Sequence, residues 1–101
     1  MPGYLIASYT VLNEEKYGKY REMGMPTLAQ YGGKVLISSD NPVVLEGKPA
    51  PSIAIIEFES VEAAQRWYDS PEYAKVKQFR HQGGVSEGWI VIVPQFEMPQ
   101  V

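Results

Sequence analysis

Hydrophobic residues at two different spacings divide the first third of the chain into a strand and a helix. The uncharged run at residues 3–12, rich in β-branched and aromatic side chains, predicts a strand. Asn13 then predicts a helix N-cap, because two glutamates follow it in the first helical turn. Apolar positions spaced by three and four continue to Tyr31, where two glycines end the helix. Pro26 removes a backbone donor within this pattern, so we expect a kink or a restart near Met25.

The middle of the chain has the pattern of strands separated by turns. Residues 34–38 predict the second strand, which Pro42 and its polar neighbours interrupt and which residues 43–46 could resume. Residues 47–51 predict a turn. Residues 53–58 have the strongest strand pattern in the chain.

A second helix and a last strand complete the pattern. Ser60 predicts the N-cap of a helix that carries Trp67 on its apolar face. Pro71 lies where a helical turn would restart, and a glutamine followed by two glycines at residues 82–84 stops the helix. Residues 89–93 predict the last strand.

This order of elements is the split βαβ arrangement of an α+β, ferredoxin-like domain. In such a βαββαβ fold, a four-stranded antiparallel sheet carries two helices on one face. A length of 101 residues allows one domain. We therefore predict a single ferredoxin-like domain over residues 1–101, with its core at residues 3–94 and a C-terminal tail at residues 95–101.

The predicted strands at residues 53–58 and 89–93 are apolar at both alternating sets of positions. Two helices can cover only one face of a sheet, whereas an antiparallel sheet with a solvated face carries polar residues there. A second copy, packed sheet against sheet about a two-fold axis, is the most economical cover. We therefore predict a homodimer through the sheet faces. The alternative is a monomer with an exposed apolar sheet.

Composition narrows the partners of the protein. The net charge is -3, and the nine basic residues are scattered from Lys16 to Arg80, so we expect no nucleic-acid binding. The chain contains no cysteine, which excludes disulfides and thiol chemistry. No apolar run approaches the roughly 20 residues of a membrane span, and the N-terminus lacks the features of a signal peptide. We expect a cytoplasmic protein that does not bind membranes.

The common signatures of metal and nucleotide enzymes are missing from the sequence. One histidine without any cysteine cannot form the usual zinc or iron sites. The sequence contains no P-loop, no GxGxxG and no GxSxG. We expect neither a metal nor a cofactor.

Three segments together resemble a known family. They are Tyr-Gly-Gly at residues 31–33, Ile-Glu-Phe at residues 56–58 and Trp-Tyr-Asp-Ser-Pro-Glu-Tyr at residues 67–73. They are similar to a family of short bacterial proteins known only as a domain of unknown function, DUF1330, and the resemblance runs over residues 3–94. It implies a dimeric α+β barrel, in which two ferredoxin-like sheets close into a shared barrel. That wider group includes cofactor-independent monooxygenases, haem-handling enzymes and small isomerases or dehydratases, so the resemblance leaves the function open.

His81 and Arg80 are the first candidates for chemistry. Histidine is the side chain whose ordinary pKa lies closest to neutrality, so a general acid or base is most easily placed at His81. If both residues face the space between helix and sheet, Arg80 could bind a carboxylate or enolate oxygen through its planar fork. The alternative is structural, because both lie in the last turn of the predicted helix, where cations satisfy its C-terminus.

Glu57 is the second candidate, at the end of an otherwise apolar strand. Alternation places it on the same side as Ile53 and Ile55. A buried carboxylate there would be a plausible proton acceptor. A salt bridge to Arg80 or to a lysine would instead give it a structural role. The sequence leaves both interpretations open.

Aromatic residues are expected to crowd the space between helices and sheet. The candidates for ligand binding are Tyr9, Tyr17, Trp67 and Tyr68. Aromatic residues at helical spacing usually form a core. The functional alternative is a flat pocket for an aromatic or polyketide-like ligand, with tyrosine hydroxyls as its few polar groups.

Two functional hypotheses follow. The first is a cofactor-independent enzyme acting on a small aromatic or carbonyl compound, in which Glu57 or His81 moves a proton and Arg80 holds an oxyanion. The second is a non-catalytic small-molecule-binding or stress-related module, in which the same residues are core and caps.

Overall fold

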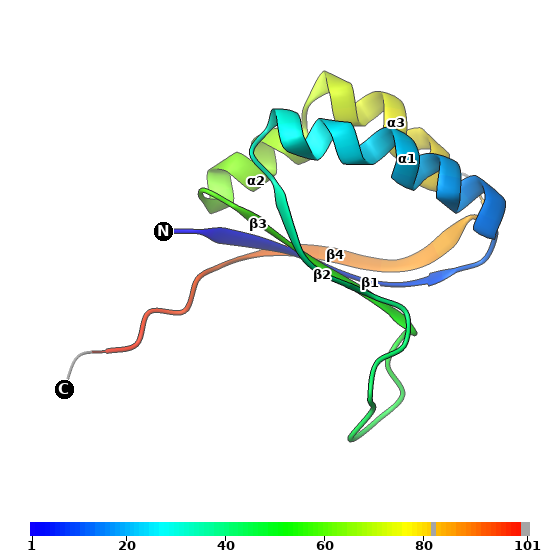
Figure 1. Cartoon of the computed structure of the whole chain (residues 1–101), viewed down its shortest axis with the longest axis horizontal. Helices are drawn as coiled ribbons and strands as arrows, with labels where there is room; N and C mark the ends of the chain where they lie inside the picture. The colour runs from blue at the N-terminus through cyan, green and yellow to red at the C-terminus, as the bar shows by residue number, and fades with distance from the viewer. Residues whose placement is uncertain (82, 100–101) are drawn as a thin grey trace.

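Four antiparallel strands form one sheet in the order β2–β3–β1–β4, and the helices lie on one side of it (Figure 1). The computed structural model describes residues 1–81 and 83–99. In chain order the elements are β1 (Gly3–Val11), α1 (Glu14–Gln30), β2 (Lys34–Ser39), β3 (Ser52–Phe58), α2 (Val61–Tyr68), α3 (Pro71–His81) and β4 (Ser86–Pro94). The ferredoxin-like α+β prediction is confirmed, and the second predicted helix consists of two segments, α2 and α3. Of the predicted stop that follows α3, Gln82 lies outside the described residues.

Both predicted N-caps are confirmed, and they explain where α1 and α2 begin. The side chain of Asn13 accepts a hydrogen bond from the Lys16 backbone N–H at 3.0 Å. The Ser60 hydroxyl accepts one from the Ala63 backbone N–H at 3.0 Å. Each bond satisfies a backbone donor that has no partner within its helix.

The α1 helix continues through Pro26 as one element, so the restart considered from the sequence does not occur. Proline cannot donate to the carbonyl four residues earlier, which belongs to Glu22. Both Glu22 and Pro26 are exposed, so water can reach the carbonyl that has lost its donor. The helix therefore tolerates the proline on its solvent side.

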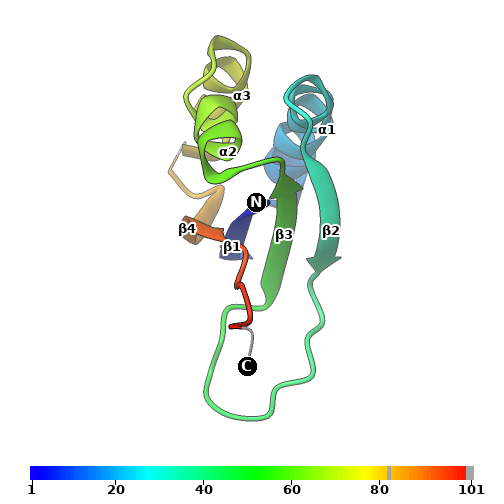
Figure 2. The same ribbon diagram turned by 90° about the vertical axis from the view of Figure 1, so that its left-hand side faces the viewer.

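The expected resumption of the second strand at residues 43–46 is wrong. The strand β2 ends at Ser39, and residues 40–51 form a long loop that projects away from the sheet (Figure 2). Prolines at positions 42, 49 and 51 flank residues 43–46 and cannot donate to a strand ladder, and the pairing of β2 with β3 ends at Ser39, so this segment has no strand beside it. Val43 and Leu45 are accordingly exposed, at 89% and 90%.

The two faces of the sheet have different surroundings. Leu5, Ile56 and Phe58 point toward the helices and pack with Trp67 and Tyr73 in the core. On the opposite face, one registered row crosses all four strands and consists only of aliphatic residues; this outer apolar row is Ile37, Ile55, Ile6 and Val91. Ile37 and Val91 are 45% and 42% exposed. The sheet is thus apolar on both faces, as the sequence indicated.

None of the helices in the described part of the chain is long and apolar enough to cross a membrane.

Candidate functional site

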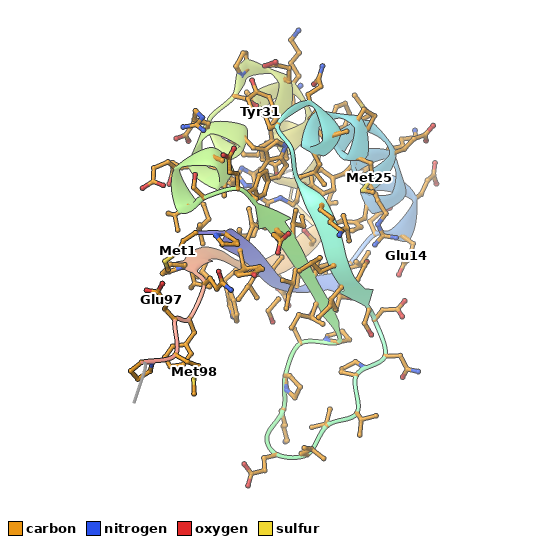
Figure 3. All side chains as sticks on the ribbon, turned by 60° about the vertical axis from the view of Figure 1, so that its left-hand side comes forward. Met1, Glu14, Met25, Tyr31, Glu97 and Met98 are labelled. Atoms are coloured by element: carbon orange, nitrogen blue, oxygen red, sulfur yellow. The ribbon has the colours of Figure 1, made fainter. Side chains whose placement is uncertain are left out.

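A cavity of about 540 Å³ lies between the helices and the sheet. Figure 3 shows side chains of both layers converging on this space. Its lining includes Tyr9, Tyr17, Tyr20, Trp67, Arg80 and His81, and also the charged residues Arg21 and Glu87. Five of the seven predicted site residues therefore line one space, which we call the interlayer cavity.

Small residues on the sheet create the volume of the interlayer cavity. Ala7 of β1 pairs with Ala54 of β3, and both line the cavity. Next to them, Tyr9 pairs with Gly88 of β4. A Cβ atom at Gly88 would clash with the backbone of Ser8 and Tyr9, so only glycine fits this close approach of β4 to β1. The sheet therefore leaves room beneath α1 and α3.

Tyrosines of β1 and α1 form one wall of the interlayer cavity. The ring centroids of Tyr9 and Tyr17 lie 5.3 Å apart, and those of Tyr17 and Tyr20 lie 5.2 Å apart. Burial, and then the neighbouring Tyr9, raise the pKa of Tyr17 above its ordinary value. Burial, and then Tyr73, do the same for Tyr20. These hydroxyls keep their protons at neutral pH and act as neutral hydrogen-bonding groups.

Arg80 brings a half-buried positive charge into this aromatic wall. Its Cζ lies 5.9 Å from the centroid of the Tyr20 ring, within range of a cation–π contact. Its Nε donates to the Tyr73 hydroxyl at 3.4 Å. Burial alone would lower the pKa of Arg80, but Tyr73 and Tyr20 offset it, so the pKa lies above the ordinary value. The guanidinium therefore stays charged in the cavity.

His81 is exposed beside Arg80. Arg80 Nη2 lies 2.9 Å from His81 Nε2, and because a guanidinium can only donate, Nε2 is the acceptor. Partial burial, then the charges of Arg80 and Lys77, lower the pKa of His81. The imidazole is therefore neutral at neutral pH, with its proton on Nδ1. The described hydrogen bonds of both side chains go to other side chains. Both residues lie in the last turn of α3, where the structural alternative also placed them.

Glu57 does not join the other two catalytic candidates. It lies on the outer face of β3, in register with Lys34 on one side and Tyr4 on the other. Partial desolvation, and then Glu57 as a hydrogen-bond acceptor, raise the pKa of Tyr4. Because Arg80 lies on the helix side, the salt bridge considered between Glu57 and Arg80 is not formed. A catalytic role for Glu57 within the interlayer cavity is not supported by its position.

The two candidates on α2 have different surroundings. Trp67 lines the interlayer cavity and is 3% exposed, and its indole Nε1 donates to Thr27 Oγ1 at 2.9 Å. Tyr68 is absent from the cavity lining among the described residues. Its ring instead lies under Lys77, whose Nζ is 4.5 Å from the centroid. Tyr68 therefore belongs to the outer packing of α2 and α3.

Tyr20 and Tyr73 are functional candidates that reasoning from the sequence did not single out. Their hydroxyl oxygens lie 2.7 Å apart. Tyr73 and Arg80 are seven residues apart on α3, which places both on one helix face. That spacing was the available signal, but a tyrosine at helical spacing has the same pattern as a core residue. The spacing alone therefore could not distinguish Tyr20 or Tyr73 from an ordinary core residue.

The described residues, 1–81 and 83–99, contain no group of three or more histidine, aspartate or glutamate side chains placed to hold a metal ion. The polar residues that line the interlayer cavity include two arginines, Arg21 and Arg80, together with His81, Glu87, two serines and three tyrosines. These groups can bind an oxyanion and exchange a proton.

Solved structures with the same fold come from several organisms. A protein of unknown function from Rhodopseudomonas palustris is 19% identical, with a TM-score of 0.76, and the match covers 96% of this chain and 84% of that one. A hypothetical protein from Arabidopsis thaliana is 14% identical, with a TM-score of 0.64, covering 98% and 90%. A protein of unknown function from Thermobifida fusca, described as dimeric and ferredoxin-like, is 10% identical, with a TM-score of 0.54, covering 94% and 92%. At these identities the likeness shows the fold alone.

No curated protein sequence matches the chain. A family model described as a domain of unknown function, DUF1330, matches residues 2–96.

Proposed function

Since the chain belongs to the DUF1330 family, whose description states no activity, we propose a function from the site itself. The protein binds a small aromatic or carbonyl compound in the interlayer cavity and acts on it without a cofactor. The observation that carries this proposal is the charged guanidinium of Arg80, which lies against the aromatic wall of the cavity.

The composition of the interlayer cavity favours a flat ligand that carries an oxygen with negative charge. Ligand sites are mostly apolar and aromatic, with a few polar groups that fix orientation. Tyr9, Tyr17 and Trp67 provide the aromatic surface. Arg80 provides a planar fork of donors that suits a carboxylate or enolate. A guanidinium in partly dehydrated surroundings stabilises such an oxygen more strongly than it would in water.

In this proposal, His81 exchanges a proton with the ligand. A ligand oxygen that accepts a hydrogen bond from Arg80 Nη2 replaces His81 Nε2 as the acceptor. The lone pair of Nε2 is then free. Nε2 then takes a proton from the carbon beside the ligand carbonyl. The C–H electron pair forms a carbon–carbon double bond, and the carbonyl pair moves onto oxygen as an enolate that Arg80 holds. Return of the proton to carbon completes exchange or isomerisation, with no oxidant or reductant required.

A thermal-shift screen tests the binding step. Aromatic acids, enols and quinones are compared on the wild type, Arg80→Gln and Arg66→Gln. Arg66 is a matched control, because it is an exposed helical arginine outside the cavity lining. A ligand at a hundred times its Kd stabilises the folded state by about 2.7 kcal/mol. Hits should shift the wild type and the Arg66 variant but not Arg80→Gln. A flat screen, or shifts that survive in Arg80→Gln, would refute the proposal.

Non-catalytic binding is the second candidate function, and one observation favours it. In the structure the Nε2 lone pair of His81 is already engaged by Arg80, and Glu57 lies on the other face of the sheet. Incubating a hit with the protein in D₂O separates the two functions. An enzyme replaces the ligand's acidic C–H by deuterium, and His81→Gln abolishes that exchange. A binding module protects the ligand without exchange.

We also propose that the protein is a homodimer that buries the outer apolar row. Support comes from the exposure of that row and from the Thermobifida fusca protein, which is described as dimeric. A contiguous apolar row on an uncovered sheet face is typical of an interaction site. Sedimentation equilibrium tests the proposal, and a monomer at every accessible concentration would refute it.

A further inference from the structure

The hydrogen bonds beside the interlayer cavity form a chain whose direction can be deduced. Arg80 Nε lies 3.4 Å from the Tyr73 hydroxyl, and the Tyr73 and Tyr20 hydroxyls lie 2.7 Å apart. A guanidinium carries five donors and no acceptor. Tyr73 Oη therefore accepts from Arg80. Distance alone does not say which tyrosine donates to the other.

Burial decides the direction of the second bond. Tyr73 is fully buried, with 0% of its surface exposed, and it does not line the cavity. Within residues 1–81 and 83–99, its hydroxyl has Arg80 and Tyr20 as hydrogen-bond partners. If Tyr20 donated, the Tyr73 proton would be buried without an acceptor, at the full desolvation cost of that group. If Tyr73 donates, both its bonds are satisfied. Tyr73 is therefore the donor and Tyr20 Oη the acceptor.

The proton of Tyr20 then points elsewhere, and Tyr20 lines the cavity. We infer that Arg80 and Tyr73 orient the Tyr20 hydroxyl so that it donates a hydrogen bond into the interlayer cavity, to an oxygen of the ligand. This inference rests on the proposed function, and it narrows the ligand class to compounds with a phenolate, enolate or carbonyl oxygen. Tyr20 is the binding residue, and Tyr73 is a positioning residue.

The protonation state of Tyr20 agrees with a donor role. Burial raises the pKa of Tyr20, so the hydroxyl carries its proton at neutral pH. The positive charge of Arg80 opposes this rise and makes the hydroxyl a stronger donor. A ligand oxygen with negative charge would gain most from such a bond, whereas an aromatic hydrocarbon or an ammonium group has no lone pair that could accept it.

The probe for this inference is 4-nitrophenolate, whose visible absorption moves to shorter wavelength when its oxygen accepts a hydrogen bond. Binding is titrated at mildly alkaline pH with the wild type, Tyr20→Phe, Tyr73→Phe and Tyr31→Phe. Tyr31 is the matched control, because its hydroxyl donates to the Glu72 carboxylate at 3.0 Å and lies outside the cavity lining. Figure 3 shows Tyr31 at the end of α1.

Tyr20→Phe should weaken binding by about tenfold to a hundredfold, as expected for a lost hydrogen bond to a charged acceptor. The bound probe should then absorb at longer wavelength than on the wild type. Tyr73→Phe should also weaken binding, by a smaller factor, because the Tyr20 proton loses its orientation. Tyr31→Phe should bind like the wild type.

Two results would overturn the inference alone. One is a Tyr20→Phe variant that binds the probe as tightly as the wild type, with the same absorption maximum. The other is tighter binding by Tyr73→Phe, because a Tyr20 that normally donates to Tyr73 would then be released toward the ligand. If the wild type itself does not bind 4-nitrophenolate at millimolar concentration, the proposed function fails, and this inference fails with it.

Discussion

Replacing Thr27 by valine tests how Trp67, which lines the interlayer cavity, is held in place. Thr27 Oγ1 donates to the Gly24 carbonyl at 2.6 Å and accepts from Trp67 Nε1 at 2.9 Å. Thr27 and Trp67 are 7% and 3% exposed, so water does not readily replace either bond. Valine has nearly the shape of threonine. The substitution therefore removes hydrogen bonds while leaving the packing almost unchanged.

Thr27→Val should lower the unfolding free energy, because it leaves the indole Nε1–H of Trp67 without an acceptor. A buried donor without an acceptor costs about 1–3 kcal/mol. The folding free energy of a single domain is about 5–15 kcal/mol, so this loss is a large fraction of it. For a chain of this length, each kcal/mol lowers the melting temperature by about 4–8 °C. We therefore expect Tm to fall by at least about 4 °C.

Urea unfolding followed by circular dichroism measures this cost. Thr10→Val on β1 is the control, because Thr10 faces away from the helices and undergoes the same chemical change without a buried partner. Thr27→Val should lower the unfolding free energy less in a Trp67→Phe background, because phenylalanine has no indole donor that could lose its acceptor. A Thr27→Val variant as stable as the wild type, or an equal loss of unfolding free energy in both backgrounds, would contradict this role for the Thr27–Trp67 hydrogen bond.

Three further predictions concern the cavity and the outer face. The pKa of His81, the chain's one histidine, should lie below about 6.5 by NMR titration. Because the unfolded chain binds this proton more readily, stability should fall as pH drops below that value, and His81→Gln should flatten the decline. Val91→Lys should convert the proposed homodimer to a folded monomer in sedimentation equilibrium, whereas a persistent dimer would exclude the outer apolar row as the interface. Ala54→Leu should fill the cavity and weaken 4-nitrophenolate binding at least tenfold without lowering the unfolding free energy, so unchanged binding would place the ligand elsewhere.

The fold could be predicted from the sequence because each element carries a local signal. Asn13 and Ser60 cap the helices that begin after them, and alternation along β3 and β4 assigns residues to the two faces. The errors occurred where a local signal was overridden or ambiguous. The Pro26 signal for a restart failed because its lost hydrogen bond faces solvent. Residues 43–46 have strand composition but no neighbouring strand to pair with.

The site was less predictable, because its parts meet only through long-range packing. Alternation correctly placed Glu57 with Ile55, but whether that face was the helix side or the outer side depends on the register of the whole sheet. The volume of the cavity comes from Ala7 opposite Ala54, a pairing between strands separated by more than 40 residues. The contact between Tyr73 and Tyr20 joins two helices in the same way.

The stability of the sheet depends on both the interlayer cavity and the outer apolar row, because residues of the two faces alternate along the same strands. Ala54 lines the cavity, while the next residue, Ile55, lies in the outer apolar row. A cavity forfeits dispersion contacts and burial that a filled core would have. A chain of 101 residues without cysteine has few other sources of stability. Burial of the outer row against a second copy would supply about 25 cal/mol for each Å² of apolar surface removed from water. On this argument the proposed dimer would offset the cost of the cavity, so a monomeric variant should also melt at a lower temperature than the wild type.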